Sequence, residues 1–342
     1  MAAFSTFQPS DFFNTVLYTG TGAEQTITGV GFQPDFTWCK DRTNSYDQVW
    51  YDAARGATKR ITSNTDTAES DQAQGLKSWN SDGFVVGTGS NINNNTNLFV
   101  SWNWKAGTTS GLTGGTITPT AYSINTTSGF GAYKYTGTAT AATIPHGLGV
   151  APAMIIVKNL SAVDNWQVYH QSVGNTKYLK LNGTNAATTS AASWNDTSPT
   201  STLFSIGDST STNGSGNSLI AYCFADKSGY SQFGKYLGNS QADGTFQYTG
   251  FRPAFVMLKK TDATSDWYLF DNKRQGYNTQ NEGLRPNSSA GELTDDYMNL
   301  VSNGFKLIST NTELNNGGSP YIYMAFAEFP FVSSNDLPGV AR

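Results

Sequence analysis

The sequence predicts an all-β protein built from three tandem antiparallel β-sandwich domains, and three observations support this prediction. Charged residues make up 13% of the 342 residues and aromatic residues another 13%; this balance argues against disorder, which needs few aromatic residues and a high net charge. Short runs of β-branched and aromatic residues alternate with Gly, Pro, Asn and Asp, as in strands joined by turns. The same pattern occurs three times along the chain.

Each of the three repeats follows the same order of landmarks. A Tyr-X-Gly phrase precedes a Gly-X-X-Pro phrase, and the distance from the first glycine to the proline is 14, 15 and 15 residues. The proline opens an apolar run, and six residues later every copy has a lysine. A tryptophan follows each lysine, and an aromatic strand closes each repeat. The lysines are Lys40, Lys158 and Lys259, and the tryptophans are Trp50, Trp166 and Trp267.

The repeats set the expected domain boundaries. We expect sandwiches at residues 1–107, 116–230 and 231–330, a linker at 108–115 and a C-terminal arm at 331–342. About 100 residues of short strands per copy suit two packed antiparallel sheets, with a separate core in each copy. The alternation from Thr116 to Ile124 predicts the first strand of the second domain. Apart from one possible helical turn at 52–56, we expect no helix, because no window shows a 3.6-residue apolar period.

Charge and hydropathy exclude several classes of protein. The net charge is −4 and the isoelectric point is near 5.2, which argues against broad electrostatic capture of nucleic acid or anionic membrane. No run approaches 18 apolar residues, so membrane insertion is not expected. The first residues lack the basic and apolar regions of a signal peptide. Cys39 and Cys223 lie in apolar runs and are expected to be buried free thiols.

Candidate binding residues lie mainly in polar loops. Trp79 and Trp194 are candidate platforms for stacking on a sugar, and the Asn-rich loops near the end of each repeat offer carboxamides. Two other interpretations of these loops remain open, which are turn chemistry and calcium binding. The repeated lysines are expected at the solvent edge of their strands, and Trp50, Trp166 and Trp267 in cores. The candidate glycan-binding asparagines are Asn93, Asn95, Asn213 and Asn315.

Signals for an enzyme are poor. No HExxH, GxSxG or phosphate-loop pattern occurs, so we expect neither catalysis nor a cofactor nor a metal. Two pairs of carboxylates keep a glycosidase as an alternative, since Asp47 with Asp52, or Asp266 with Asp271, could face each other across a cleft. Surface carboxylates beside strands explain these pairs equally well.

Six phrases of the sequence carry a resemblance to a known family. They are Tyr18-Thr19-Gly20, Gly31-Phe32-Gln33-Pro34-Asp35, Asp52 to Lys59, Trp102 to Gly107, Ile144 to Pro152, and Phe246 to Pro253. These phrases resemble a repeat domain of virion structural proteins from tailed bacteriophages, especially marine ones. The resemblance extends from about Phe12 to Phe329 and implies lectin-like, concanavalin-type jelly-roll sandwiches without a catalytic motif. The second copy lacks the Asp-Arg-Gly phrase of the first, and the third has Asp271-Asn272-Lys273-Arg274 in its place.

The resemblance and the repeats together lead to an expected function. We expect a virion structural protein, acting as a tail fibre, adaptor or decoration subunit, that is assembled in the host cytoplasm and released by lysis. Its expected partners are other virion proteins, further copies of itself (a trimer is favoured) and a host-surface glycan. Phe12, Phe13 and Phe331 are candidate docking residues. The alternative is a carbohydrate-binding module or polysaccharide depolymerase with triplicated lectin-like domains.

Overall fold

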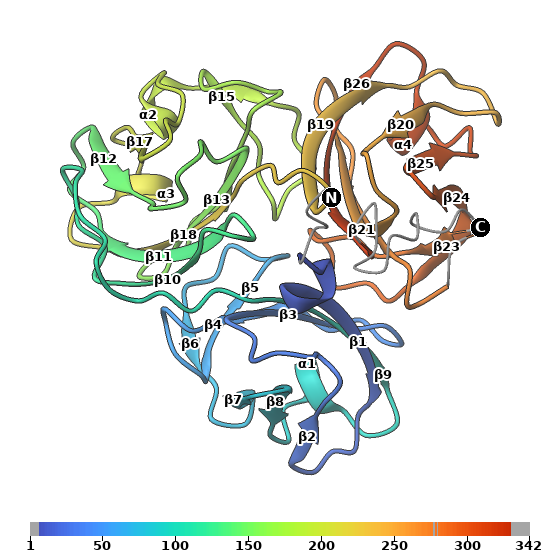
Figure 1. Cartoon of the computed structure of the whole chain (residues 1–342), viewed down its shortest axis with the longest axis horizontal. Coiled ribbons are helices and arrows are strands. Elements are labelled where there is room, and N and C mark those ends of the chain that lie inside the picture. Colours follow the sequence, from blue (N-terminus) through green and yellow to red (C-terminus); the bar gives the residue numbers. More distant parts are fainter. Residues whose placement is uncertain (1–6, 276–277, 279, 330–342) are drawn as a thin grey trace, which may run out of the picture.

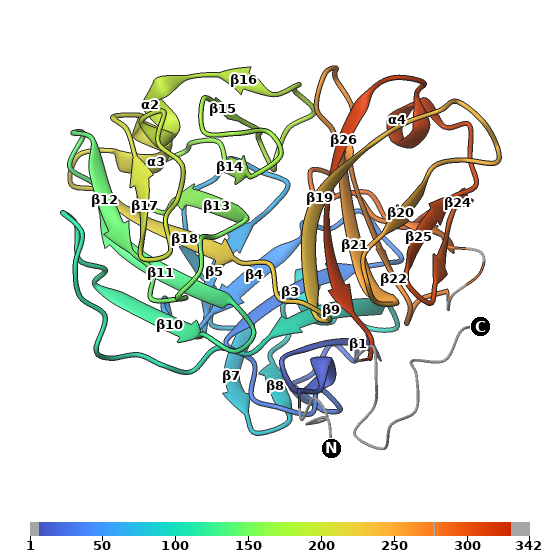
Figure 2. The ribbon, with the colours of Figure 1, turned by 45° about the horizontal axis from the view of Figure 1, so that its top comes forward.

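Three lobes of β-structure surround a common centre (Figure 1). The computed structural model describes residues 7–275, 278 and 280–329. Each lobe corresponds to one sequence repeat, and we call residues 13–104 repeat 1, residues 121–224 repeat 2 and residues 231–327 repeat 3. The turned view in Figure 2 shows the largest sheet of each lobe beside this centre. The prediction of an all-β protein with antiparallel sheets is confirmed.

Repeat 1 follows a short 3₁₀ helix, η1 (Pro9–Asp11), and contains two main sheets. The larger sheet has the order β1-β9-β3-β4-β5-β6, and the smaller one has the order β2-β8-β7. The elements are β1 (Phe13–Thr19), β2 (Gln25–Ile27), β3 (Phe36–Asp41), β4 (Val49–Asp52), β5 (Lys59–Thr62), β6 (Ser70–Asp71), β7 (Leu76–Asn80), β8 (Gly83–Val86), α1 (Ser90–Asn93) and β9 (Leu98–Trp104).

Repeat 2 contains the order β10-β11-β18-β13-β14 and the pairs β12-β17 and β15-β16. Its first strand covers only part of the stretch predicted from Thr116 to Ile124. The elements are β10 (Ala121–Asn125), β11 (Phe130–Thr136), β12 (Ala142–Pro145), β13 (Met154–Asn159), β14 (Gln167–His170), β15 (Lys177–Tyr178), β16 (Thr188–Thr189), α2 (Ala191–Trp194), β17 (Leu203–Ile206), α3 (Thr210–Asn213) and β18 (Ser218–Phe224).

Repeat 3 contains the orders β19-β26-β21-β22 and β20-β25-β24-β23. The sheets of the three repeats share the central order β1-β9-β3-β4, which recurs as β11-β18-β13-β14 and β19-β26-β21-β22. The elements are β19 (Ser231–Leu237), β20 (Phe246–Tyr248), β21 (Pro253–Lys260), β22 (Trp267–Asp271), β23 (Gln280–Gly283), β24 (Leu293–Val301), β25 (Gly304–Leu307), α4 (Thr312–Asn315) and β26 (Pro320–Ala327).

The strand after each repeated proline is buried on both faces because it has an apolar layer on each side. In β13, Met154 and Ile156 belong to a cluster shared by all three repeats, while Ile155 and Val157 belong to a cluster within repeat 2. This is the period-two alternation of a strand with both faces covered. β3 and β21 show the same division.

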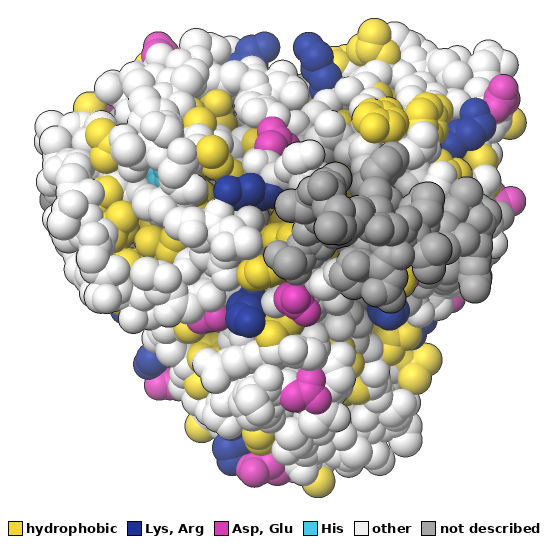
Figure 3. Space-filling view, in the orientation of Figure 1, with side chains coloured by type: hydrophobic (Ala, Val, Ile, Leu, Met, Phe, Trp, Pro, Cys, Tyr) yellow, Lys and Arg dark blue, Asp and Glu magenta, His cyan; other side chains and the backbone are white. Residues whose placement is uncertain are grey.

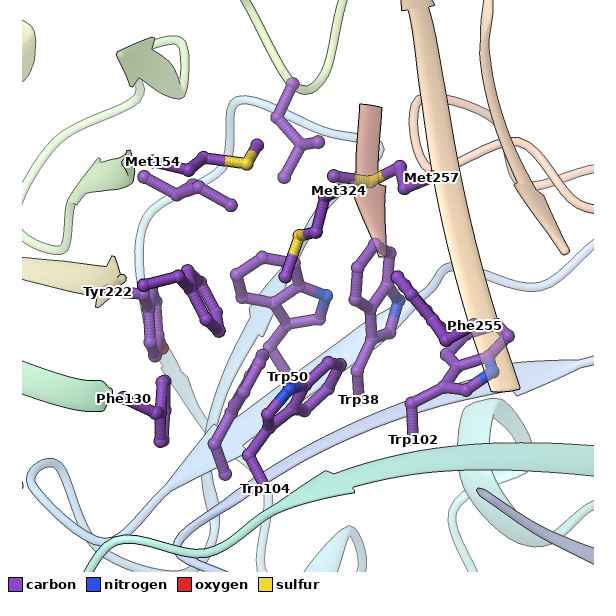
Figure 4. Packing of buried hydrophobic residues seen from close by; sticks show 14 of the residues in the cluster. Trp38, Trp50, Trp102, Trp104, Phe130, Met154, Tyr222, Phe255, Met257 and Met324 are labelled. Carbon is purple, nitrogen blue, oxygen red and sulfur yellow. The ribbon is translucent and has the colours of Figure 1, made fainter. Parts of the chain in front are cut away.

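The shared cluster, which we call the central core, joins the three repeats. Figure 4 shows its tryptophan, phenylalanine and methionine side chains converging from the three lobes. Rings from different repeats are in contact: Phe36 and Tyr222 have centroids 4.8 Å apart, and Trp50 and Trp166 also 4.8 Å. The expectation that the aromatic residues belong mainly to three separate cores fails for the residues of the central core, because one face of each larger sheet packs against the other two repeats.

Candidate functional site

The contacts between neighbouring repeats are the most regular polar feature of the molecule. We call them seam 1/2, seam 2/3 and seam 3/1, after the repeats that meet there. Strand pairing identifies equivalent positions: Asp52, His170 and Asp271 lie opposite Phe36, Met154 and Phe255 on the adjacent strand. Each of these three side chains is buried and reaches the next repeat.

Two of the three positions hold a buried ion pair. Asp52 accepts a hydrogen bond from the Arg55 guanidinium and another, at 2.6 Å, from the hydroxyl of Tyr222 in repeat 2. Asp271 accepts from Arg274 at 2.6 Å and from the indole of Trp102 in repeat 1 at 3.0 Å. The opposite charge beside each arginine raises its pKa despite burial.

The third position holds a neutral histidine. Burial lowers the pKa of His170 to about 4, so the ring is uncharged at neutral pH. The amide of Ser172 donates to Nδ1, and Nε2 therefore carries the hydrogen that it donates to the carbonyl of Tyr323 in repeat 3, at 3.1 Å. The second repeat thus fills the position without the charged pair.

These contacts bear on the carboxylate pairs considered for a glycosidase. Asp52 and Asp271 are fully buried and each is bound to its own arginine. Their suggested partners accept hydrogen bonds from other residues, with Asn64 donating to Asp47 at 2.8 Å and Asn287 donating to Asp266 at 2.6 Å. Asp52 and Asp271 thus bind partners inside the protein, and these contacts give no support to the carboxylate pairs as a catalytic site.

The repeated lysines were predicted at the solvent edge, and this prediction is wrong. Lys40, Lys158 and Lys259 are buried. Each ammonium donates to at least one backbone carbonyl of its own repeat and also to one carbonyl of the preceding repeat. The carbonyls reached across the seams belong to Ser289 (3.0 Å, from Lys40), Asp66 (2.9 Å, from Lys158) and Thr184 (3.2 Å, from Lys259).

These lysines predict an unusual dependence of stability on pH. Burial lowers the pKa of each to about 8, whereas the unfolded chain keeps its value near 10.5. Between about pH 7.5 and 9 the unfolded lysines therefore bind more protons than the folded ones, so each lysine raises the free energy of unfolding by up to about 1 kcal/mol per pH unit. Urea unfolding at fixed pH values measures this slope.

The rise is expected to reverse above about pH 9. Burial raises the pKa of Cys39 and Cys223, and that of Tyr321 and Tyr323 to about 12, so buried thiols and tyrosines ionise first in the unfolded chain and stability falls. The variant Lys158→Met should lower the slope below about pH 9 by up to about 1 kcal/mol per pH unit. A slope that Lys158→Met leaves unchanged would contradict the role of the lysines.

The register corrects the sequence alignment of the tryptophans. Val49, Gln167 and Tyr268 are equivalent because they lie opposite Cys39, Val157 and Leu258. Trp166 and Trp267 therefore correspond to Gln48, and Trp50 lies two positions further along its strand. All three tryptophans are buried, as their interpretation as core residues predicts.

The residues at the corrected position also cross the seams. The indole of Trp166 donates to the carbonyl of Thr62 in repeat 1 at 3.0 Å, and that of Trp267 donates to the carbonyl of Lys180 in repeat 2 at 2.8 Å. The side-chain amide of Gln48 donates to the carbonyl of Ser288 in repeat 3 at 3.3 Å. Each of the three seams thus has an equivalent set of contacts through which a repeat binds the one before it. The set at seam 3/1, where repeat 1 binds repeat 3, closes the ring.

The loop asparagines proposed for glycan contact have a different role. Asn93, Asn213 and Asn315 each end a one-turn helix and are fully buried. Asn93 accepts from the amide of Thr21 at 2.8 Å and donates to the carbonyls of Ala23 and Gly87. Asn213 and Asn315 make the equivalent bonds in their repeats. The three side chains therefore hold separate loops together, and their burial leaves them inaccessible to a glycan.

A matched pair of asparagines in one loop tests this role. Asn93→Ala leaves buried backbone donors and acceptors without partners, so we expect the free energy of unfolding to fall by about 2–3 kcal/mol. Asn95 is exposed, and Asn95→Ala should change it by less than about 0.5 kcal/mol. Urea unfolding of both variants gives the comparison, and equal effects of the two substitutions would refute the structural role.

The remaining predicted site residues are dispersed. Trp79 is half-buried and donates to Thr37 at 3.3 Å, whereas Trp194 is buried and so is not a sugar platform. Phe13 lies in the central core and is not a docking residue. Phe12 is half-buried and stacks on Phe7 with centroids 4.8 Å apart. Phe331, with the predicted C-terminal arm, lies outside the described residues.

A cavity of about 670 Å³, lined by both polar and aromatic side chains, lies at seam 2/3 beside the edge strand β19. Asp226 accepts from the amide of Phe233 and from the side-chain amide of Gln171, both at 2.8 Å. Gln171 also donates to the carbonyl of Phe233 at 2.6 Å. Burial raises the pKa of Asp226. Sequence reasoning missed this site because its two sides come from different repeats.

Three further features of the described residues concern the cysteines, the helices and the surface. Cys39 and Cys223 are buried and free, as predicted. None of the helices in the described part of the chain is long and apolar enough to cross a membrane. Most of the face shown in Figure 3 consists of neutral side chains and backbone, with scattered charges.

Comparison with known proteins identifies one match. Residues 8–330 match the model of a family described as a domain of unknown function, DUF7483. No curated protein and no solved structure matches the chain.

Proposed function

The chain belongs to the family of the domain of unknown function DUF7483, and we propose, from its own residues, that it is a structural protein of a tailed-bacteriophage virion. It acts as a tail fibre, adaptor or decoration subunit that serves particle assembly and attachment to the host surface. It is assembled in the host cytoplasm and leaves the cell by lysis within the particle. This role is non-catalytic and needs no cofactor.

The observation that carries the proposal is the closed ring of repeats. Three chemically similar seams and one central core unite the copies, which is the arrangement that cyclic oligomers normally obtain from separate chains. A rigid ring carries three sets of loops around one axis, as suits a subunit at a symmetric position of a particle. The phage-like sequence phrases support the same role.

The finer architecture is part of the proposal. We assign each repeat as one antiparallel β-sandwich of the lectin-like jelly-roll type, with boundaries at 1–107, 116–230 and 231–330. The support is the cluster of apolar residues between the larger and smaller sheet of each repeat. Residues 108–115 link the first two sandwiches.

Locating the protein in purified phage particles tests the proposal. Antibodies against the full chain, detected with gold in electron micrographs, should label intact virions at a fixed position on the head or tail. Particles that lack the protein by labelling and by mass spectrometry would refute the proposed role.

The proposed self-association is measured separately. A trimer is favoured because weak attachment sites gain from multivalency. Sedimentation of the purified chain should give three times the monomer mass of 36.8 kDa, and a mass that stays at the monomer value at high concentration would contradict the trimer.

The alternative function, a carbohydrate-binding module, is supported by the cavity at seam 2/3.

A further inference from the structure

We propose that the cavity at seam 2/3 binds a neutral oligosaccharide, with the ring of Tyr248 as the stacking surface and the side-chain amides of Gln171 and Gln232 as hydrogen-bonding groups. This inference rests on the proposed role in host attachment and assigns it a site. The site lies between β19 and β20 of repeat 3 and the end of the larger sheet of repeat 2.

Part of the polar lining holds the shape of the cavity. Asp226 and Gln171 together satisfy the amide and carbonyl of Phe233, which point outward from the edge strand β19. The carbonyl oxygen of the Gln232 side chain accepts from the hydroxyl of Tyr323 at 2.9 Å. These bonds fix the side chains before a ligand arrives, and such preorganisation reduces the entropic cost of binding.

Another part of the lining is available to a ligand. Within the described chain, no protein partner is found for the Gln232 side-chain nitrogen, the Gln171 side-chain oxygen, the Ser228 hydroxyl or the Tyr248 hydroxyl. These groups combine donors and acceptors, as the hydroxyls of a sugar require. Tyr248 is 54% exposed, so its ring can cover the apolar face of a sugar.

The pseudo-threefold arrangement provides an internal comparison for the cavity. At seam 3/1, Asn272, Glu328 and Thr15 are equivalent to Gln171, Asp226 and Phe233 by strand pairing. The cavity lined there by these residues has a volume of only about 110 Å³. At seam 1/2, the extra strand β10 pairs with β11 along the equivalent edge and covers it, with Ser123 opposite Ala132.

The aromatic residues of β20 are also specific to repeat 3. Phe246 and Tyr248 are exposed. The residue between them lies opposite Phe305, and the residue opposite the equivalent Phe84 of repeat 1 lies between Thr26 and Thr28, so these threonines occupy the same positions in repeat 1. Repeat 2 has Thr143 and Pro145 there. Of the two aromatic residues, Tyr248 lines the cavity at seam 2/3, and the other two repeats fold without an aromatic residue at its position.

Size and charge define the ligand class. A volume of about 670 Å³ lies within the range of small-molecule sites and accommodates a few sugar rings. Asp226 is the single charged side chain among the lining residues, and it is acidic. A neutral saccharide is therefore favoured over a sulfated or uronic-acid chain, which the carboxylate would repel.

A glycan array tests the inference with the full chain. Biotinylated protein displayed on streptavidin should bind neutral oligosaccharides in preference to acidic ones. For a neutral trisaccharide that binds, titration calorimetry should show that Tyr248→Ala and Gln232→Ala each weaken affinity at least about tenfold. Tyr248→Phe keeps the ring and should stay within about threefold. The exposed Val163, which is outside the cavity lining, provides the control Val163→Ala, expected to be without effect.

The inference fails if the array shows no binding of neutral glycans, or if folded Tyr248→Ala and Gln232→Ala variants retain the affinity of the unmodified protein. Circular dichroism confirms that each variant is folded. Binding to glycans and location in the virion are independent measurements. Labelled virions with a chain that binds no glycan overturn this inference alone, and a glycan-binding chain that is missing from virions overturns the virion role alone.

Discussion

A fragment containing only the second repeat and its linker, residues 108–230, is expected not to fold, whereas the complete chain is expected to unfold in one cooperative transition. The reason is the central core. In the fragment, Met154, Ile156, Trp166, Tyr222 and Phe224 would lose their partners from the other repeats and form an exposed apolar face. Soluble monomeric proteins rarely tolerate large patches of this kind.

The measurement is circular dichroism and NMR of the fragment, compared with urea unfolding of the full chain by tryptophan fluorescence and circular dichroism. The fragment should aggregate or give poorly dispersed spectra. A control separates loss of neighbours from loss of chain connectivity: a protease site inserted in the exposed segment near Gly111 should allow cleavage while the pieces remain associated. A soluble fragment with a native-like β-sheet spectrum would contradict the shared core.

The second large effect is expected at the buried ion pair of seam 1/2. Asp52→Ala removes the partner of the Arg55 guanidinium and the acceptor of the Tyr222 hydroxyl, and the arginine remains buried. Removing one member of a buried pair typically destabilises a protein by about 3–5 kcal/mol. Because Glu69 also contacts Arg55 at 3.0 Å, we expect about 3 kcal/mol, measured by urea unfolding at pH 7.

An exposed ion pair in the same repeat provides the control. Lys59 and Asp71 are 2.8 Å apart at the surface, where solvent screens the charges, so Asp71→Ala should destabilise the protein much less than Asp52→Ala. The double variant Asp52→Ala/Arg55→Met removes both buried charges and should recover part of the loss. If Asp52→Ala costs no more than Asp71→Ala, the ion pair does not stabilise the seam.

The elements within each repeat could be predicted from the sequence because their signals are local. The prolines Pro34, Pro152 and Pro253 precede apolar runs, and the structure has strands there. The threefold repetition of these signals also allowed the copies to be aligned. The alignment was wrong at Trp50, where the larger spacing from Lys40 concealed that Gln48, and not the tryptophan, is the equivalent residue.

The contacts between repeats could not be predicted because they join residues far apart in the sequence. A lysine at the end of a strand normally keeps its ammonium in water. Lys158 does not, because the carbonyl of Asp66, 92 positions earlier, replaces that water. The cavity at seam 2/3 escaped prediction for the same reason: Gln171 and Tyr248 gain a common role only when the repeats are placed side by side.

Carrying three copies in one chain has a genetic consequence. In a ring of three identical subunits, every substitution appears at three places, so a residue needed for packing at one interface is constrained at all of them. Here each copy is encoded separately. His170 could therefore replace the acidic residue found in the other two copies, and one seam could open into a cavity while its counterparts remained narrow or covered. Each interface in such a chain can therefore differ from the other two.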